Sequence, residues 1–275
     1  SWMALLDHFI QGQYGWRDCP PPIRLRVEAL VDDLEVALGD DLVGIYLHGS
    51  LSVGTFNPRW SDVDLVGVTR QPLSALARRT VAEAFLRHSR PPRGVEAMFV
   101  AESALRPWLY PTPYQFYFSE KRRAQYEADL RSGAWREWFA MPAMSHQLAA
   151  HIPELRKRGV RLSGEPIEDT FPEVPEEDYL ASILEDFDSK KERLPMSTIS
   201  GILNACRCYA HLREGGLFSK EEAANWALIV LPPQDRRLVR KALDVYQGRR
   251  PLRERFDPAQ VARFFSEMAA KPDTR

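Results

Sequence analysis

The sequence predicts an α+β protein with two domains, because three features change along the chain. Short apolar runs of strand length alternate with helical patterns up to about residue 101, and almost only helical patterns follow from about residue 120. A proline-rich stretch, FPEVP at residues 171–175, lies within the helical part and marks the expected domain boundary. We therefore expect an N-terminal domain over residues 1–170, with a mixed β-sheet and flanking helices, and a C-terminal α-helical bundle over residues 171–275.

The front half begins with a helix at 23–38, whose apolar residues recur at helical spacing before Gly39 ends it. Apolar runs then predict three strands, with a helix crossing back over the sheet before the third. Prolines and aromatic residues crowd the next segment, which predicts irregular but well-packed structure. In order, these elements are expected at 42–49, 61–68, 73–88 (the helix), 95–101 and 107–118 (the irregular segment).

The back half shows no internal repeat, and its loops carry prolines. Helical spacing predicts helices at 120–140, 145–158, 177–192, 197–213, 219–230, 233–247 and 257–270.

Composition excludes several classes of protein. The chain has 275 residues, of which 44% are hydrophobic and 27% charged, with a formal net charge of -1. A near-neutral chain has no global field for nucleic acid, and no apolar run reaches membrane-spanning length, so we expect neither partner. The start, SWMALLDHFI, lacks a basic segment and contains Asp7, which argues against a signal peptide. Three cysteines without zinc spacing favour a reducing, cytoplasmic location. The oligomeric state, monomer or dimer, is not readable.

Two acids interrupt the second predicted strand. Asp62 and Asp64 are two residues apart, so their side chains should leave the sheet on one face. Adjacent carboxylates repel, and Mg²⁺ resolves this because it prefers hard oxygen ligands together with substrate phosphates. An exposed strand face or a turn cap is the alternative for such a pair.

A glycine-serine pair at the end of the preceding strand favours the metal interpretation. Gly49 lets the backbone approach a phosphate closely, and Ser50 offers a hydroxyl and an amide as donors. Glu96, on the next strand, is the candidate for a third acid, unless it is a solvated carboxylate at a strand edge.

The segment HGSLSVGTFNPRWSDVDLVGV resembles the active site of the polymerase-beta-like nucleotidyltransferases. From about residue 30 to the end, the chain is similar to the bacterial aminoglycoside adenylyltransferases that act on streptomycin and spectinomycin. The resemblance implies that Asp62 and Asp64 bind two Mg²⁺ ions, and that Glu96 is the base and also a metal ligand. It also implies that Gly49, Ser50 and Ser61 hold the phosphates of ATP.

In the helical half, Arg207, the segment SKEEAANWAL with Lys220, and Tyr246 follow the order and spacing of this family. The resemblance implies that these three residues reach the nucleotide from the second domain, which would close the cleft for nucleotide and acceptor. Independently, Ser219 and Glu222 predict a capping box, which places Lys220 in the first turn of a helix, where anions are favoured.

The chain departs from the family at positions that concern the acceptor. Lys121 stands where these enzymes carry a tryptophan, and Ser197 where they carry an aspartate. Acids of the segment around Asp186 could still attract a cationic acceptor, unless they form an ordinary charged helix face.

The sequence therefore predicts an enzyme that uses Mg²⁺ to transfer AMP from ATP to a hydroxyl of a small polar acceptor, an aminoglycoside or aminocyclitol antibiotic. Two alternatives remain open at this stage. One is a nucleotidyltransferase that modifies another small molecule, a protein or RNA, and the other is a nucleotide-binding module without catalysis.

Overall fold

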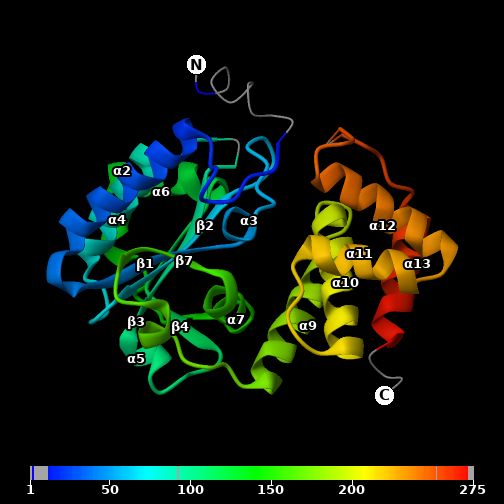
Figure 1. The fold of residues 1–275 in the computed structure, drawn as a ribbon. Coiled ribbons are helices and arrows are strands. Elements are labelled where there is room, and N and C mark those ends of the chain that lie inside the picture. The colour runs from blue at the N-terminus through cyan, green and yellow to red at the C-terminus, as the bar shows by residue number, and fades with distance from the viewer. Residues whose placement is uncertain (1, 3–11, 92, 252, 272–275) are drawn as a thin grey trace. The chain divides into compact units, whose positions relative to one another are not determined.

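A computed structural model describes residues 2, 12–91, 93–251 and 253–271. The N-terminal stretch SWMALLDHFI, which we expect not to be a signal peptide, lies largely outside these residues. The chain divides into two compact units, Ser1–Val174 and Pro175–Arg275 (Figure 1).

The first unit is built on a five-stranded sheet in the order β5-β3-β2-β1-β7. Strands β2 and β3 are parallel, whereas the β1–β2, β1–β7 and β3–β5 pairs are antiparallel, so the predicted mixed sheet is confirmed. A two-stranded sheet joins β4 and β6. The strands are β1 (Leu42–His48), β2 (Val63–Thr69), β3 (Val95–Ala101), β4 (Thr112–Tyr114), β5 (Phe116–Phe118), β6 (Ala143–Ser145) and β7 (Val160–Gly164).

Helices surround this sheet. They are α2 (Pro21–Leu38), α3 (Ser50–Val53), α4 (Ala75–His88), α5 (Glu102–Leu105), α6 (Arg123–Ser132), α7 (Leu148–Arg158) and α8 (Ile167–Thr170), with short 3-10 turns η2 (Gly39–Asp41), η3 (Glu120–Arg122) and η4 (Ala134–Glu137).

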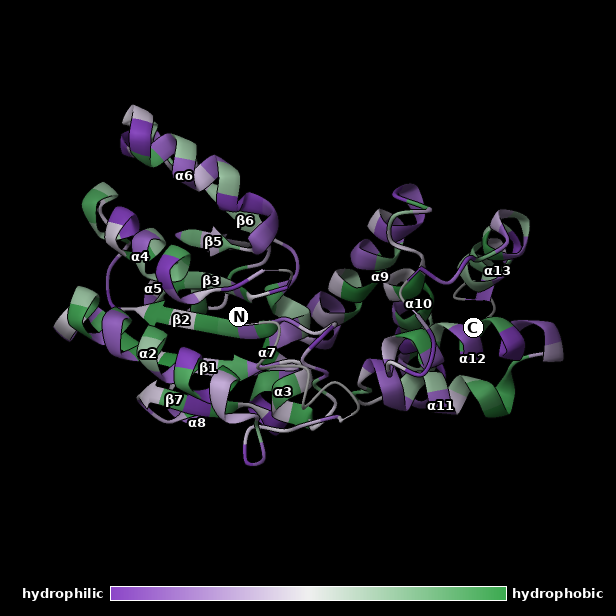
Figure 2. Ribbon diagram, turned by 90° about the horizontal axis from the view of Figure 1, so that it is seen from above, coloured by the Kyte–Doolittle hydropathy of each residue, from purple (hydrophilic) through white to green (hydrophobic). Residues whose placement is uncertain are grey.

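Apolar residues cover both faces of the sheet, which explains why the central strands are almost continuously apolar (Figure 2). On one face, alternate strand residues such as Val63 and Leu65 pack in one core with α2 and α4. On the other face, Val66 and Val68 pack against Leu148, Ile152 and Leu155 of α7. Side-chain alternation along each strand therefore decides which of its polar residues face α7.

The structure differs from the sequence prediction in the segments that follow β3. The expected irregular stretch at 107–118 contains β4 and β5, and β6 and β7 were not predicted. The helix expected over 120–140 breaks after α6, because Gly133 ends it with φ 87 and a new 3-10 turn begins. A left-handed residue cannot continue a right-handed helix, and glycine adopts that conformation without penalty.

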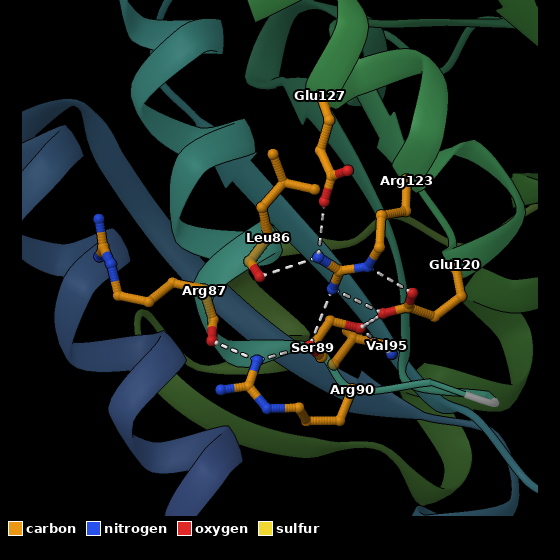
Figure 3. Close-up of polar contacts among 8 residues, drawn as sticks. All are labelled: Leu86, Arg87, Ser89, Arg90, Val95, Glu120, Arg123 and Glu127. Carbon is orange, nitrogen blue, oxygen red and sulfur yellow. Dashed lines mark hydrogen bonds and ion pairs between the residues drawn. The ribbon is translucent and has the colours of Figure 1, made fainter.

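A buried polar network holds the start of β3 (Figure 3). The amide of Val95 donates to Ser89 Oγ at 2.9 Å, and that hydroxyl donates to Glu120 Oε1 at 2.5 Å. The Arg123 guanidinium donates to both Glu120 oxygens, at 2.7 and 3.0 Å, and to the carbonyls of Leu86 and Ser89. Burial raises the pKa of Glu120, but the bonds from Arg123 and Ser89 outweigh it and leave the pKa below its usual value. The network therefore ties α4, β3 and η3 together next to Glu96.

The second unit is helical. Its helices are α9 (Glu176–Glu192), α10 (Thr198–Glu214), α11 (Lys220–Val230), α12 (Pro233–Tyr246) and α13 (Pro258–Ala270). Helix α10 contacts each of the other four, so its residues from Gly201 to Cys206 are buried. No helix among the residues that the structure describes is long and apolar enough to span a membrane. Cys19, Cys206 and Cys208 are free thiols and buried.

Candidate active site

Three carboxylates converge at the start of the two parallel strands. Asp64 in β2 and Glu96 in β3 are directly paired in the parallel register, and Asp62 lies one residue before β2 begins. One oxygen from each of the three lies within 4.8 Å of the others. All three residues are half-buried. The structure thus brings together the acids that the sequence predicted as one site, although Asp62 precedes the strand in which we expected it.

Strand alternation explains why these acids point the same way. Their neighbours Val63, Leu65, Val95 and Ala97 all pack in the core beneath α2 and α4. Asp64 and Glu96 alternate with these residues, so their side chains leave the opposite face of the sheet. Because strands fix the backbone, the separation of the two carboxylates is set by the register rather than by a loop.

This donor set fits a divalent cation. Three ionised carboxylates at such distances repel one another, and a cation bound between them removes that repulsion. All the donors are hard oxygens, which is the ligand type that Mg²⁺ prefers, and Mg²⁺ usually leaves positions for water and substrate phosphate. Asp62, Asp64 and Glu96 are therefore the residues that would hold such an ion.

Gly49 lies directly against the acids. It has φ 74 and ψ -157, a conformation that is essentially restricted to glycine. A Cβ atom at this position would lie 2.9 Å from Cγ of Asp64 and still closer to its Oδ2. The carbonyl of Gly49 accepts the amides of Ser52 and Val53, at 3.0 and 3.2 Å, which starts α3 with Ser50 as its first residue. The glycine therefore permits both the turn and the close approach of Asp64.

Ser61 closes the loop that leads into Asp62. Its Oγ accepts the amide of Asn57 at 3.0 Å, and its own amide donates to the carbonyl of Asn57 at 2.9 Å. Asn57 is 2% exposed, so these bonds anchor the loop from inside. The predicted contact of Ser61 with phosphate stays a prediction.

Tyr117 is a polar neighbour of the acids that the sequence analysis missed. Its hydroxyl donates to Glu96 Oε1 at 2.6 Å. Burial and the adjacent Glu96 carboxylate raise the pKa of Tyr117 well above its usual value, so the hydroxyl keeps its proton and acts as a donor. The residue lies in the segment that we expected to be irregular, and no local pattern there pointed to a strand.

His48 is packed beside the acids. It pairs with Asp64 across β1 and β2, and its ring lies 4.8 Å from that of His151 on α7. Burial, with a smaller effect of His151, holds the pKa of His48 well below 6.5. The ring is therefore neutral around pH 7, which fits a packed residue rather than a phosphate-binding cation.

The second unit gathers positive charge around the residues predicted to bind nucleotide. Ser219 and Glu222 form the predicted capping box, so Lys220 begins α11, and its Nζ lies 6.0 Å from the centre of the Tyr246 ring. Burial lowers the pKa of Lys190 on α9, the Asp186 carboxylate opposes that shift, and the charges of Lys220 and Arg207 add to it. Lys190 is thus a further cation near Lys220 and Arg207 that the sequence analysis missed, because an isolated KK pair on a charged helix carries no distinctive pattern.

The residues predicted for the acceptor offer little free negative charge. Asp186 accepts two hydrogen bonds from Lys190 Nζ, both at 2.7 Å, and its side chain is 18% exposed. Ser197 Oγ donates to the carbonyl of Lys190 at 2.7 Å. Lys121 is exposed in η3. Their predicted contacts with an acceptor stay predictions.

Comparisons with known proteins agree along most of the chain. Residues 169–271 match the family described as aminoglycoside adenylyltransferase, C-terminal domain. A spectinomycin 9-adenylyltransferase of Staphylococcus aureus is 27% identical over 225 residues, which cover 80% of this chain and 82% of the relative. An aminoglycoside (3'') (9) adenylyltransferase of Klebsiella pneumoniae is 26% identical over 240 residues, which cover 82% of this chain and 86% of the relative.

The fold has a solved counterpart. A crystal structure of a spectinomycin adenyltransferase from Enterococcus faecialis, with ATP and spectinomycin, superimposes with a TM-score of 0.77. The match covers 91% of this chain and 99% of that one, at 18% sequence identity. At this identity the likeness concerns the fold, and both units of the chain take part in it.

Proposed function

We propose that this chain transfers AMP from ATP to a hydroxyl of an aminoglycoside or aminocyclitol antibiotic, because its sequence is similar to aminoglycoside and spectinomycin adenylyltransferases along most of its length. The observation that carries the proposal is the cluster of Asp62, Asp64 and Glu96 at the start of two parallel strands, against the Gly49 turn. A packing role would not require three carboxylates to approach one another within a half-buried site, since their repulsion costs stability unless a cation balances it.

In the proposed reaction, the acceptor oxygen attacks the α-phosphorus of ATP. The new bond joins the acceptor oxygen to that phosphorus, the bond between the α-phosphorus and its bridging oxygen to the β-phosphate breaks, and pyrophosphate leaves. Glu96 takes the proton of the acceptor hydroxyl. Two bound Mg²⁺ ions would neutralise the charge that accumulates on the phosphate oxygens. Asp62 and Asp64 would hold the metal, and the backbone at Gly49 and Ser50 would contact the phosphates.

We assign the cations of the second unit to the nucleotide as well. The positive charges of Lys220 and Arg207 both act on Lys190, and each of the three residues is half-buried. Cations that repel one another in a partly desolvated place are stabilised by a bound anion, and a triphosphate is the anion that this reaction supplies. Tyr246, next to Lys220, is assigned to the same nucleotide.

For the acceptor, we favour a compound with few positive charges, such as spectinomycin. Asp186 is already neutralised by Lys190, Ser197 stands where the family carries an acid, and Lys121 adds a positive charge where the family carries a tryptophan. Streptomycin, with its two guanidinium groups, demands more negative charge than these positions provide. The cytoplasm, where ATP is available, is the proposed location.

The test is a pyrophosphate-release assay with ATP and Mg²⁺ across a panel of aminoglycosides and aminocyclitols. We expect release that depends on spectinomycin and is lost in Asp64→Asn, with wild-type thermal stability retained. The proposal would be refuted if no compound in the panel stimulated pyrophosphate release, or if Asp64→Asn kept near-normal turnover. Labelled ATP incubated with lysate protein and RNA separates the remaining acceptor classes.

A further inference from the structure

Tyr117 reaches the acid cluster from a strand on the other side of β3. In the antiparallel pairing of β3 with β5, Tyr117 lies opposite Met98, two residues from Glu96 on the same face. Diagonal neighbours across two strands are within reach of a tyrosine side chain. The hydroxyl donates to Glu96 Oε1 at 2.6 Å, a length typical of a bond to an ionised carboxylate.

The tyrosine itself is held in place by its surroundings. Its neighbours Phe116 and Phe118 are fully buried in the core on the opposite face. Its backbone carbonyl accepts a hydrogen bond from the Tyr126 hydroxyl, and the Arg122 guanidinium carbon lies 4.9 Å from the centre of its ring. The position of the Tyr117 hydroxyl is therefore set by the sheet and by the packing on both sides.

The orientation of the Glu96 carboxylate depends on its hydrogen-bond partners, because the last torsion of a glutamate side chain is broad and roughly two-fold. A hydrogen bond from a fixed donor to one oxygen selects one orientation of the planar group. Hydrogen-bond partners of this kind orient metal-binding carboxylates, and their removal typically weakens metal affinity or activity by about 10- to 100-fold.

We propose that Tyr117 is a positioning residue for Glu96: its hydroxyl sets the rotation of the carboxylate toward Asp62 and Asp64, so that a divalent cation and the acceptor hydroxyl meet it in one orientation. The part that concerns the acceptor rests on the proposed adenylyl transfer. The part that concerns the cation needs only the geometry of the four side chains. Nothing in the family resemblance points to Tyr117, and its role follows from the pairing of β3 with β5 alone.

The experiment compares Tyr117→Phe with Tyr46→Phe in the full chain. Each change removes one hydroxyl and keeps the ring. The Tyr46 hydroxyl lies 2.8 Å from both the carbonyl of Glu165 and the hydroxyl of Thr170, within the same unit and away from Glu96, which makes it the matched control. Mn²⁺ serves as the probe, and its binding is measured by electron paramagnetic resonance without nucleotide. The kcat, the KM for ATP and the midpoint of thermal unfolding are measured alongside.

We expect Tyr117→Phe to bind Mn²⁺ about tenfold more weakly and to lower kcat by about 10- to 100-fold, with the KM for ATP within about twofold of wild type. Tyr46→Phe should lose thermal stability and keep wild-type Mn²⁺ affinity and kcat. The proposal is overturned if Mn²⁺ affinity is unchanged in Tyr117→Phe, if the wild-type chain shows no saturable Mn²⁺ binding, or if both variants lose Mn²⁺ affinity equally. If Mn²⁺ binding weakens as expected and no variant transfers AMP, the proposed function fails while the role of Tyr117 in holding Glu96 stands.

Discussion

Replacing Gly49 by alanine tests how the turn and the acids depend on each other. The added Cβ would lie 2.9 Å from Cγ of Asp64, whereas carbon atoms in contact normally lie roughly 3.5 Å apart or more. The carboxyl carbon must therefore retreat by at least about 0.6 Å, and Oδ2, which lies closer, must move further. A misplacement of about 1 Å at a reacting centre can cost about 10²-fold in rate.

The backbone adds a separate cost. With φ 74 and ψ -157, an alanine at position 49 occupies a region that costs on the order of 1–3 kcal/mol. We therefore expect Gly49→Ala to lower kcat by about 100-fold and to lower the free energy of unfolding by about 1–3 kcal/mol. Pyrophosphate release gives the first quantity and urea denaturation the second.

Gly54→Ala is the matched control for this prediction. Gly54 also has a positive φ, of 89, but a Cβ there meets nothing within 4 Å. It should cost about 1–2 kcal/mol of stability through the backbone alone and keep turnover close to wild type. Equal losses of turnover in the two variants would refute the argument, because contact with Asp64 would then not be the cause. Full activity in Gly49→Ala would refute it as well.

Two further predictions concern stability. Arg123→Met removes the main partner of the Glu120 carboxylate, whose side chain is 9% exposed. Urea denaturation should therefore show a free energy of unfolding lower by about 3–5 kcal/mol, and a loss below about 1 kcal/mol would contradict the role of the network. Burial, with the nearby Glu267 carboxyl, raises the pKa of Asp235 from 3.8 to about 6. The stability that protonated Asp235 contributes should therefore be complete below pH 3.8 and decline as the pH rises to about 6. Asp235→Asn should flatten this pH dependence and raise the free energy of unfolding at pH 7 by on the order of 2 kcal/mol. If the variant kept the wild-type slope of stability against pH between these values, the assignment to Asp235 would be contradicted.

The acids could be predicted from the sequence because their signal is local. Asp62 and Asp64 interrupt an apolar run, and Gly49 and Ser50 end the apolar run before it, so a few neighbouring residues carry the chemistry. Glu96 was found because it begins the next apolar run, and the parallel register with Asp64 follows from two strands joined by a crossover helix. The helical second half was equally readable from its spacing and from the capping box at Ser219.

The rest depends on contacts between distant parts of the chain. Tyr117 joins the site only because β5 pairs with β3, and a three-residue strand in a segment rich in proline leaves no periodic pattern. Lys190 becomes notable only when α9 brings it near Arg207 and Lys220. The break at Gly133 was missed because a single glycine within a helical pattern is often tolerated. These features are set by tertiary packing, which local spacing does not encode.

The most direct test of the central claim is the mass of the acceptor after incubation with ATP and Mg²⁺. Spectinomycin should gain one AMP group and release one equivalent of pyrophosphate, in a reaction that the wild-type chain catalyses and Asp64→Asn does not. Unmodified spectinomycin and streptomycin, from a wild-type chain that binds ATP and Mn²⁺, would contradict the claim that this acid cluster performs adenylyl transfer to such antibiotics.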